Sequence, residues 1–308
     1  MCKYRYSIII PHKNCPELLE RCLKSIPDRT DIQVIVVDDA SNSVERIQDI
    51  EKEKIVSNLE VIYSNANKGA GAARNIGIGR CKGEWLLFAD ADDFFDKDAF
   101  AIFDDYSDTE CDIIYFHHSS VYSDTLQECI RFNERNERID NYLNNRSQNS
   151  SANLRYRDAV PWGKLFRYSL VKGNNFTFDE VPASNDVMFT TKCGNAAKQI
   201  TADSRNTYIV TFRKGSLTTS PSVNNMRARY EVMLRYSLFV RAAGHPEFQG
   251  RPLSAVFKAI RLFGLKEGVH YIKLANNYGV SLLTGFRTLH KSIYLHLKAL
   301  YNRDFHKY

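Results

Sequence analysis

The sequence predicts an α/β fold in which a mainly parallel sheet is flanked by helices, followed by a helical C-terminal extension. Short apolar segments typical of buried strands alternate with segments of helical spacing over residues 5–116. Carboxylates follow two of the apolar segments, at Asp38 and Asp39 and again at Asp90, Asp92 and Asp93. Because parallel strands end at one edge of a sheet, both carboxylate groups are expected at a common crevice.

The predicted elements follow in chain order. Strands are expected at residues 5–10, 32–37, 59–63, 85–89 and 112–116, with a short helix at about 97–105. Residues 119–158 favour a solvated insertion, in which residues 144–151 form a loop or, alternatively, a flexible lid. A strand interrupted near residues 204–206 is expected at 200–212, and helices are expected around 226–238, 253–263 and 282–300.

Composition narrows the class of protein. The 308 residues are 44% hydrophobic and 12% aromatic, which suffices for a packed core and excludes a disordered chain. The seven Cys residues are dispersed without a CxxC pair, which favours reduced thiols. With no visible signal peptide and no apolar stretch of membrane-spanning length, a cytoplasmic protein is expected.

Positive charge is concentrated at the C-terminus. From Leu253 onward the chain has nine Lys or Arg residues and two acidic ones, while the whole chain has a net charge of +6. Residues 221–308 are therefore predicted to form a basic helical region. Such a region is suited to bind the anionic inner face of a membrane. A solvated basic face, or a helix pair that binds a protein, is an equal alternative. No nucleic-acid partner is expected.

The segment from Gly83 to Asp93 predicts a metal-bridged diphosphate. Side chains alternate along an extended segment, so Asp90 and Asp92 are expected to point the same way and Asp93 the other way. Two converging carboxylates repel each other unless a cation or proton separates them, and oxygen ligands favour Mg²⁺ or Mn²⁺. The alternative is an acidic turn whose last Asp caps the following helix.

The motifs at residues 7–14, 36–41, 67–77, 83–93, 162–165 and 185–189, taken in order, resemble the family 2 glycosyltransferases of GT-A fold. The resemblance covers roughly residues 5–220. It implies an inverting, metal-dependent transfer of a sugar from a nucleotide diphosphate donor, commonly a UDP-sugar, to a glycan or lipid-linked acceptor. It also implies a domain at residues 1–220, with a nucleotide-binding half at 1–118 and an acceptor half at 119–220.

Residue chemistry suggests how the nucleotide is held. A uracil N–H needs an acceptor, for which Asp39 is the first choice and Asp38 the second, and Pro11 stands where the base would meet backbone. Glycine inside a helix costs about 1 kcal/mol, so the glycines of residues 69–77 indicate close approach to a strand or a ligand. The candidates for contact with ribose or diphosphate are Asn67, Gly69 and Arg74.

The resemblance assigns the remaining roles. Asp90 contacts ribose or the metal, and Asp92 binds the metal, which is Mn²⁺ or Mg²⁺. The family usually has Glu before its catalytic Asp, whereas Asn185 stands there in this chain. Asn can hydrogen-bond a sugar but cannot take a proton, so the role of general base falls to Asp186. The alternative for Asp186 is an ordinary helix N-cap.

Four further candidates are less specific. Trp162 offers an apolar face to a sugar but suits a buried core equally well. Lys164 suits a phosphate, although a solvated lysine is the usual finding. Arg213 and Ser216 resemble a basic loop that closes on the diphosphate.

Other classes of protein fit less well. No GxGxxG follows the first strand and no GxxxxGK[ST] is present, which excludes a dinucleotide dehydrogenase and a P-loop NTPase. The alternatives kept are a sugar nucleotidyltransferase, although its Gly-rich basic loop is absent after the first strand, and a non-catalytic nucleotide-sugar or glycan-binding module. The presence of Asp90, Asp92 and Asp186 together argues against a module that only binds.

Overall fold

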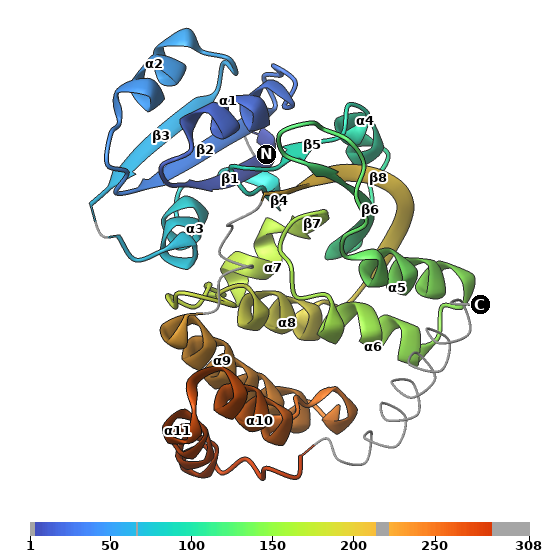
Figure 1. The fold of residues 1–308 in the computed structure, drawn as a ribbon. Coiled ribbons are helices and arrows are strands. Elements are labelled where there is room, and N and C mark those ends of the chain that lie inside the picture. Colours follow the sequence, from blue (N-terminus) through green and yellow to red (C-terminus); the bar gives the residue numbers. More distant parts are fainter. Residues whose placement is uncertain (1–3, 66, 214–221, 285–308) are drawn as a thin grey trace, which may run out of the picture. The chain divides into compact units, whose positions relative to one another are not determined.

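The computed structural model describes residues 4–65, 67–213 and 222–284. The chain divides into two compact units, Met1–Pro221 and Ser222–Tyr308. Figure 1 shows the described helices and strands in the colours of the sequence.

The first unit is built on an eight-stranded sheet with the order β3-β2-β1-β4-β7-β6-β8-β5. The strands β3, β2, β1 and β4 are parallel, as predicted, whereas β7 is antiparallel to both of its neighbours. Strand β8 is parallel to β6 and antiparallel to β5. The strands are β1 Tyr4–His12, β2 Ile32–Asp39, β3 Leu59–Ser64, β4 Gly83–Phe88, β5 Phe94–Phe95, β6 Ile113–Tyr122, β7 Lys164–Arg167 and β8 Ile200–Phe212.

Two apolar cores form because side chains alternate along the strands. Ile8 and Ile10 of β1 belong to one core and Ile9 to the other. The first core takes residues from α1 (Pro16–Lys24), α2 (Glu45–Glu53) and α4 (Ala99–Asp104). The second takes residues from α3 (Ala70–Ile78), α5 (Asn133–Asn144), α6 (Gln148–Arg157), α7 (Tyr168–Gly173) and α8 (Val187–Ala196). Helices therefore cover both faces of the sheet (Figure 1).

One helical glycine confirms the predicted close approach to a strand. A Cβ added at Gly77 of α3 would stand 2.6 Å from Ile9 Cγ2 of β1. Any larger residue at this position would push α3 away from the sheet, so the cost of a helical glycine is offset by close helix–strand packing.

The predicted solvated insertion at residues 119–158 is wrong for most of its length. Strand β6 extends to Tyr122, and α5 and α6 follow it. The expected loop at 144–151 is reduced to a short connection, because Ser147 and Ser150 form a reciprocal capping box that begins α6. Only a few residues of this polar helix are buried, including Ala152 and Leu154. Its polar composition is therefore the same as that of a loop, and the sequence did not predict a helix.

The second unit is helical. Its helices are α9 (Val223–Ala242), a 3₁₀ turn η1 (Pro246–Phe248), α10 (Pro252–Phe263) and α11 (Leu265–Asn277). Tyr230 and Tyr271 stack with ring centroids 4.2 Å apart in its core. The helices expected around 226–238 and 253–263 are confirmed, α11 was not predicted, and most of the segment expected at 282–300 lies outside the described residues. Among the described residues, no helix is both long and apolar enough to cross a membrane.

Candidate active site

Asp38 and Asp39 end β2 beside the end of β1, as the parallel pairing of these strands requires. His12 Nδ1 and Asp38 Oδ1 are 2.8 Å apart in the interior, and the Ser41 N–H donates to Asp38 Oδ2 at 3.0 Å. Asp38 therefore fixes the loop that follows its own strand. Pro11 pairs with Val37 one residue before the end of β1, so the strand continues past the residue expected to end it.

Asp39 holds the segment that leads into α3. The backbone N–H groups of Lys68 and Gly69 donate to its two carboxylate oxygens at 2.9 and 2.8 Å. Gly69 has φ of +87°, a conformation that favours glycine, and it is the N-cap residue of α3. Asn67 accepts a hydrogen bond from Lys13 Nζ. Asn67 and Gly69 thus lie in one loop at the carboxyl end of β2, beside Asp39.

Arg74 connects two sequence motifs that are far apart along the chain. It is buried on α3, and its guanidinium donates to Asp90 Oδ1 at 2.5 Å and to Asn185 Oδ1 at 2.9 Å. The guanidinium also lies over the Phe178 ring, 5.2 Å from the centroid. Three predicted site residues are therefore brought together, and Asn185 is fixed by Arg74.

A second glycine explains how this contact is reached. A Cβ added at Gly71 of α3 would stand 2.1 Å from the Asp179 carbonyl oxygen. The Asp179 N–H donates to the Asn185 carbonyl at 3.1 Å, so residues 179–185 form a compact loop against α3. Only glycine allows this approach, which brings Asn185 within reach of Arg74.

The carboxylates after β4 lie close to one another, with Asp93 buried and Asp90 and Asp92 partly exposed. Burial, together with the charge of Asp90, raises the pKa of Asp92. Burial and the charges of Asp90 and Asp92 raise the pKa of Asp93 well above its usual value. Asp93 Oδ1 accepts the Thr211 N–H at 2.7 Å, which ties the turn to β8. Asp93 therefore fixes the turn, while Asp90 and Asp92 remain the candidates for a ligand.

Asp186 occupies the N-cap position of α8, but its side chain makes no capping hydrogen bond. Burial raises the pKa of its carboxyl group, and the charge of Arg74 opposes that rise. The structure places Asp186 next to Asn185, which Arg74 links to Asp90. A carboxyl group with a raised pKa and no capping partner is suited to exchange a proton.

The carboxylate set fits a hard cation in part. Among the described residues, no cluster of three or more acidic, His or Cys side chains is assembled to hold a metal. Asp90 and Asp92 supply two carboxylates, and Mg²⁺ in proteins is usually bound by one or two carboxylates together with substrate phosphates and water. The mutual repulsion that raises the pKa of Asp92 is the interaction that a cation would relieve.

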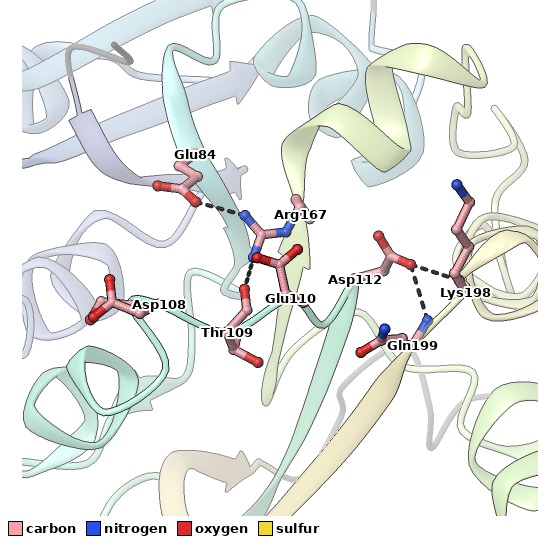
Figure 2. A pocket seen from close by; sticks show the side chains of 9 residues that line it. Glu84, Asp108, Thr109, Glu110, Asp112, Arg167, Lys198 and Gln199 are labelled. Carbon is pink, nitrogen blue, oxygen red and sulfur yellow. Dashed lines mark hydrogen bonds and ion pairs between the residues drawn. The ribbon is translucent and has the colours of Figure 1, made fainter.

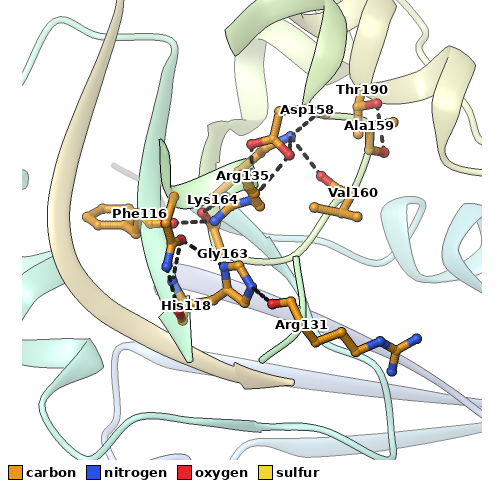
Figure 3. A network of polar contacts seen from close by, with 11 residues as sticks. Phe116, His118, Arg131, Arg135, Asp158, Ala159, Val160, Gly163, Lys164 and Thr190 are labelled. Atoms are coloured by element: carbon orange, nitrogen blue, oxygen red, sulfur yellow. Dashed lines mark hydrogen bonds and ion pairs between the residues drawn. The ribbon is translucent and has the colours of Figure 1, made fainter. Parts of the chain in front are cut away.

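Trp162 and Lys164 lie in the interior. Figure 3 shows Lys164 among its polar partners. The Trp162 ring stacks on Tyr208 with centroids 5.4 Å apart and contacts the ring of His118. The ammonium of Lys164 donates to the Asp158 and Val160 carbonyls at 2.6 and 2.7 Å. The buried-core alternative describes Trp162, whereas the solvated alternative for Lys164 is wrong, because its side chain is buried and bound by these carbonyls.

The basic loop expected to close on the diphosphate is described only at its start. Arg213 follows β8, and its charge opposes the rise in the pKa of the Asp92 carboxyl group that burial causes. Ser216 lies outside the described residues.

A separate cavity of about 570 Å³ lies where strands β4 and β6 begin, at the opposite end of these strands from Asp90 and Asp92. Figure 2 shows the side chains that line it. Its lining includes Glu84 at the start of β4 and Asp112 just before β6. Arg167 pairs with Glu84 at 2.6 Å, and Asp112 accepts the Lys198 N–H at 2.6 Å. Neither Asp90, Asp92 nor Asp186 lines it, so this cavity is not the candidate active site.

Sequence reasoning missed the buried pair of Arg135 and Asp158. Arg135 Nε lies 3.0 Å from Asp158 Oδ2, and both side chains are almost completely buried. They were assigned to a solvated segment because Asn, Ser, Arg and Asp dominate its composition. The missed signal was the helical spacing of Arg135, Ile139 and Tyr142, all of which are buried on α5.

Comparisons with known proteins identify the family of the chain. A family model described as glycosyl transferase family 2 matches residues 7–173. The poly(ribitol-phosphate) beta-N-acetylglucosaminyltransferase TarS of Staphylococcus aureus is 27% identical over 239 residues, covering 74% of this chain and 39% of that protein. A poly(ribitol-phosphate) beta-glucosyltransferase of Bacillus spizizenii is 29% identical over 213 residues, covering 66% of this chain and 32% of that protein. The chain therefore spans well under half the length of these relatives.

Solved structures share the fold. The crystal structure of S. aureus TarS in complex with UDP-GlcNAc superposes with a TM-score of 0.70 at 23% identity, covering 89% of this chain and 80% of that chain. A mannosyltransferase from Pyrobaculum calidifontis, in complex with GDP-Man and Mn²⁺, superposes with a TM-score of 0.56 at 15% identity, covering 96% of this chain and 81% of that chain. These similarities establish the predicted GT-A fold.

Proposed function

The chain belongs to glycosyl transferase family 2, and on that premise we propose that it transfers a sugar from a UDP-sugar to a hydroxyl group of a glycan or lipid-linked acceptor in polysaccharide biosynthesis, with inversion at the anomeric carbon. The observation that carries the proposal is the joining of Asp90, Arg74 and Asn185, which sets Asp186 beside the carboxylates that follow β4. The acceptor chemistry is supported by the relatives, which act on poly(ribitol-phosphate).

The donor is proposed to lie along the carboxyl ends of β1, β2 and β4. Asp39 accepts the uracil N–H, since two backbone N–H groups fix its carboxylate while lone pairs remain free. Pro11 lies against the base, and Asn67 and Gly69 lie near ribose or diphosphate. A UDP donor is favoured by the complex of TarS with UDP-GlcNAc.

Asp90 and Asp92 are proposed to hold Mn²⁺ or Mg²⁺. When bound, such a cation stabilises the negative charge that develops on the leaving diphosphate. Arg74 orients Asp90 by donating to one of its oxygens, which leaves the other oxygen for a ligand. The Mn²⁺ in the Pyrobaculum calidifontis complex supports the choice of metal.

Asp186 is proposed as the general base. An acceptor hydroxyl attacks the anomeric carbon and gives its proton to the Asp186 carboxylate, while UDP leaves from the opposite face of the sugar. Burial raises the pKa of Asp186, which improves it as a proton acceptor, and the charge of Arg74 opposes this rise. Asn185 is held by Arg74 and is available to orient a sugar hydroxyl.

The testing experiment is a screen of nucleotide sugars with Mn²⁺ or Mg²⁺ that follows release of nucleoside diphosphate. Asp186→Asn should fold, bind UDP and lose roughly 10²–10⁴ in turnover, because a base is removed while Asn still suits an N-cap position. Asp49→Asn, at an exposed position of α2, is the matched control and should keep wild-type turnover. Full turnover in Asp186→Asn would contradict the proposed base.

The same assay separates the alternatives. A non-catalytic binding module of this fold would bind UDP or a glycan without releasing product from any donor. A sugar nucleotidyltransferase would release pyrophosphate in place of nucleoside diphosphate. Either result would overturn the proposed reaction.

We further propose that the α10–α11 hairpin contacts an anionic membrane, which would make this cytoplasmic protein peripheral. Apart from Ser254, Gly264, Asn276 and Asn277, the exposed residues of this hairpin are apolar or basic, namely Phe257, Lys258, Arg261, Leu262, Leu265, Lys266, Val269 and Lys273. Glu267, the one carboxylate of residues 252–284, is buried and bound by Arg227 through two hydrogen bonds at 2.6 and 2.7 Å. The exposed side therefore carries no negative charge to oppose anionic lipid.

Sedimentation with vesicles tests the membrane proposal. The protein should bind vesicles that contain phosphatidylglycerol, release them as salt rises, and ignore pure phosphatidylcholine. Lys258→Glu combined with Arg261→Glu should lose this binding, whereas Lys172→Glu on the exposed side of α7 should keep it. Equal binding to both lipids would support a solvated basic face or a protein-binding helix pair.

A further inference from the structure

Lys164, the first residue of β7, places its ammonium in the interior of the first unit (Figure 3). Its side chain is 1% exposed. Nζ donates to the Asp158 and Val160 carbonyls at 2.6 and 2.7 Å and lies 3.6 Å from Asp158 Oδ1. Two N–H groups of the ammonium are thus bound by carbonyls of residues 158–160, and the Asp158 carboxylate offsets its charge, so a phosphate would have to displace these partners.

Arg135 of α5 adds a second buried cation to this cluster. It donates to the Asp158 carboxylate at 3.1 Å and to the Gly163 carbonyl at 2.8 Å. Two cations therefore share one carboxylate, and an unbalanced charge in the interior is costly. Asp186 is a further carboxylate that interacts electrostatically with Lys164.

Thr190 joins the cluster to Asp186 through the backbone. Figure 3 shows Thr190 beside Ala159. Its N–H donates to the Asp186 carbonyl at 3.0 Å, which closes the first turn of α8. Its hydroxyl lies 3.0 Å from the Ala159 carbonyl and 3.0 Å from the Asp186 carbonyl, and it can donate to one of them at a time. Lys164 and Thr190 therefore bind three consecutive carbonyls, those of residues 158–160.

We propose that Lys164 is a positioning residue for Asp186, because its ammonium fixes residues 158–160 against the first turn of α8. The Asp186 side chain makes no capping hydrogen bond, so its place depends on the backbone of this turn. The inference rests on the proposed function in taking Asp186 as the base. Misplacing a reacting group by about 1 Å costs about 10²-fold in rate, which is the loss expected without the ammonium.

Lys164→Met tests the proposal, since Met has a similar length but no charge and no N–H. We expect kcat to fall about 10²-fold, while the Kd for UDP changes less than about twofold. Lys172→Met, at an exposed position of α7, is the matched control and should leave kcat unchanged. A kcat for Lys164→Met within about twofold of wild type would overturn the proposal.

A double-mutant cycle separates positioning from general loss of structure. If Lys164 acts through the Asp186 carboxylate, adding Lys164→Met to Asp186→Asn should cost almost nothing more in kcat. Equal losses in both backgrounds would overturn the proposal and leave Lys164 a structural residue. Full turnover in Asp186→Asn alone would instead refute the base, and thus the proposed function.

Two further measurements cover the remaining outcomes. Thr190→Val removes the hydroxyl group and leaves the buried charges unchanged. If Lys164→Met fails to fold, Thr190→Val can replace it in the double-mutant cycle with Asp186→Asn. Hydrogen exchange needs no turnover, and in Lys164→Met it should accelerate at the amides of residues 187–190 while β1 stays protected. Unchanged exchange at residues 187–190 would contradict the proposed link.

Discussion

Arg74→Met is expected to weaken both the first unit and the donor site. The Arg74 side chain is 6% exposed, and its guanidinium is bound by Asp90 and Asn185 and lies over Phe178. Met keeps the apolar stem but removes every one of these contacts. The Asp90 carboxylate would then lie near Asp92 without the Arg74 guanidinium to offset its charge.

The magnitude can be worked from these contacts. A hydrogen bond to a charged group contributes about 1.5–3 kcal/mol, and a cation–π contact about 0.5–2 kcal/mol. Asp90 is 35% exposed, so solvent screens its pairing with Arg74, and contacts that share one guanidinium do not add. We therefore expect a loss of about 2–3 kcal/mol, which corresponds to a fall in melting temperature of about 5–10 °C for a domain of this size.

Arg80→Met is the matched control for this prediction. Arg80 follows α3, is 60% exposed and pairs with Glu60 at 3.6 Å, so its loss should cost less than about 0.5 kcal/mol. Calorimetry gives the melting temperatures, and titration calorimetry with UDP gives the affinity, which should weaken in Arg74→Met alone. Melting temperatures within about 1 °C of each other in the two variants would refute the reasoning.

Three further predictions follow from the same contacts. Asp92→Ala should abolish transfer, as should EDTA on the wild type, and full activity in excess EDTA would exclude the metal. Gly71→Ala should lower stability by about 1–3 kcal/mol, because its Cβ would stand 2.1 Å from the Asp179 carbonyl, whereas Gly79→Ala meets nothing closer than 3.4 Å. Burial lowers the pKa of His118 to about 4, whereas the unfolded chain takes up this proton at about pH 6.5. The free energy of unfolding, measured with urea, should therefore fall as pH drops from about 6.5 towards 4. His118→Gln should reduce that fall.

The parallel half of the fold could be predicted because its determinants are local. Strands β1, β2 and β4 are buried on both faces and read as continuous apolar segments, and carboxylates mark where β2 and β4 end. The sheet beyond β4 could not be predicted. Strand β7 has four residues and is antiparallel to both of its neighbours. It is too short for its length or its pattern of apolar residues to predict its position in the sheet.

The candidate site was predictable to the extent that its residues follow strands. Asp38, Asp39 and Asp90 are positioned by the strands they follow, whereas the partners of Arg74 depend on a loop that approaches α3 at Gly71. The burial of Lys164 had no local signal, because it depends on Arg135 and Asp158 in other elements. Whether a charged residue is buried depends on partners that are distant in the sequence, and the composition of a segment does not reveal those partners.

The contrast between two groups of buried charges supports the position of the site. In the cluster of Arg135, Asp158 and Lys164, each cation is matched by a carboxylate or by carbonyl oxygens. Asp92 and Asp186 differ, because their carboxyl groups have raised pKa values that neighbouring cations only partly offset. A fold tolerates such unbalanced carboxyl groups where binding or chemistry uses them. Their occurrence after β4 and at the start of α8 thus favours a reaction site there over a merely structural acidic turn.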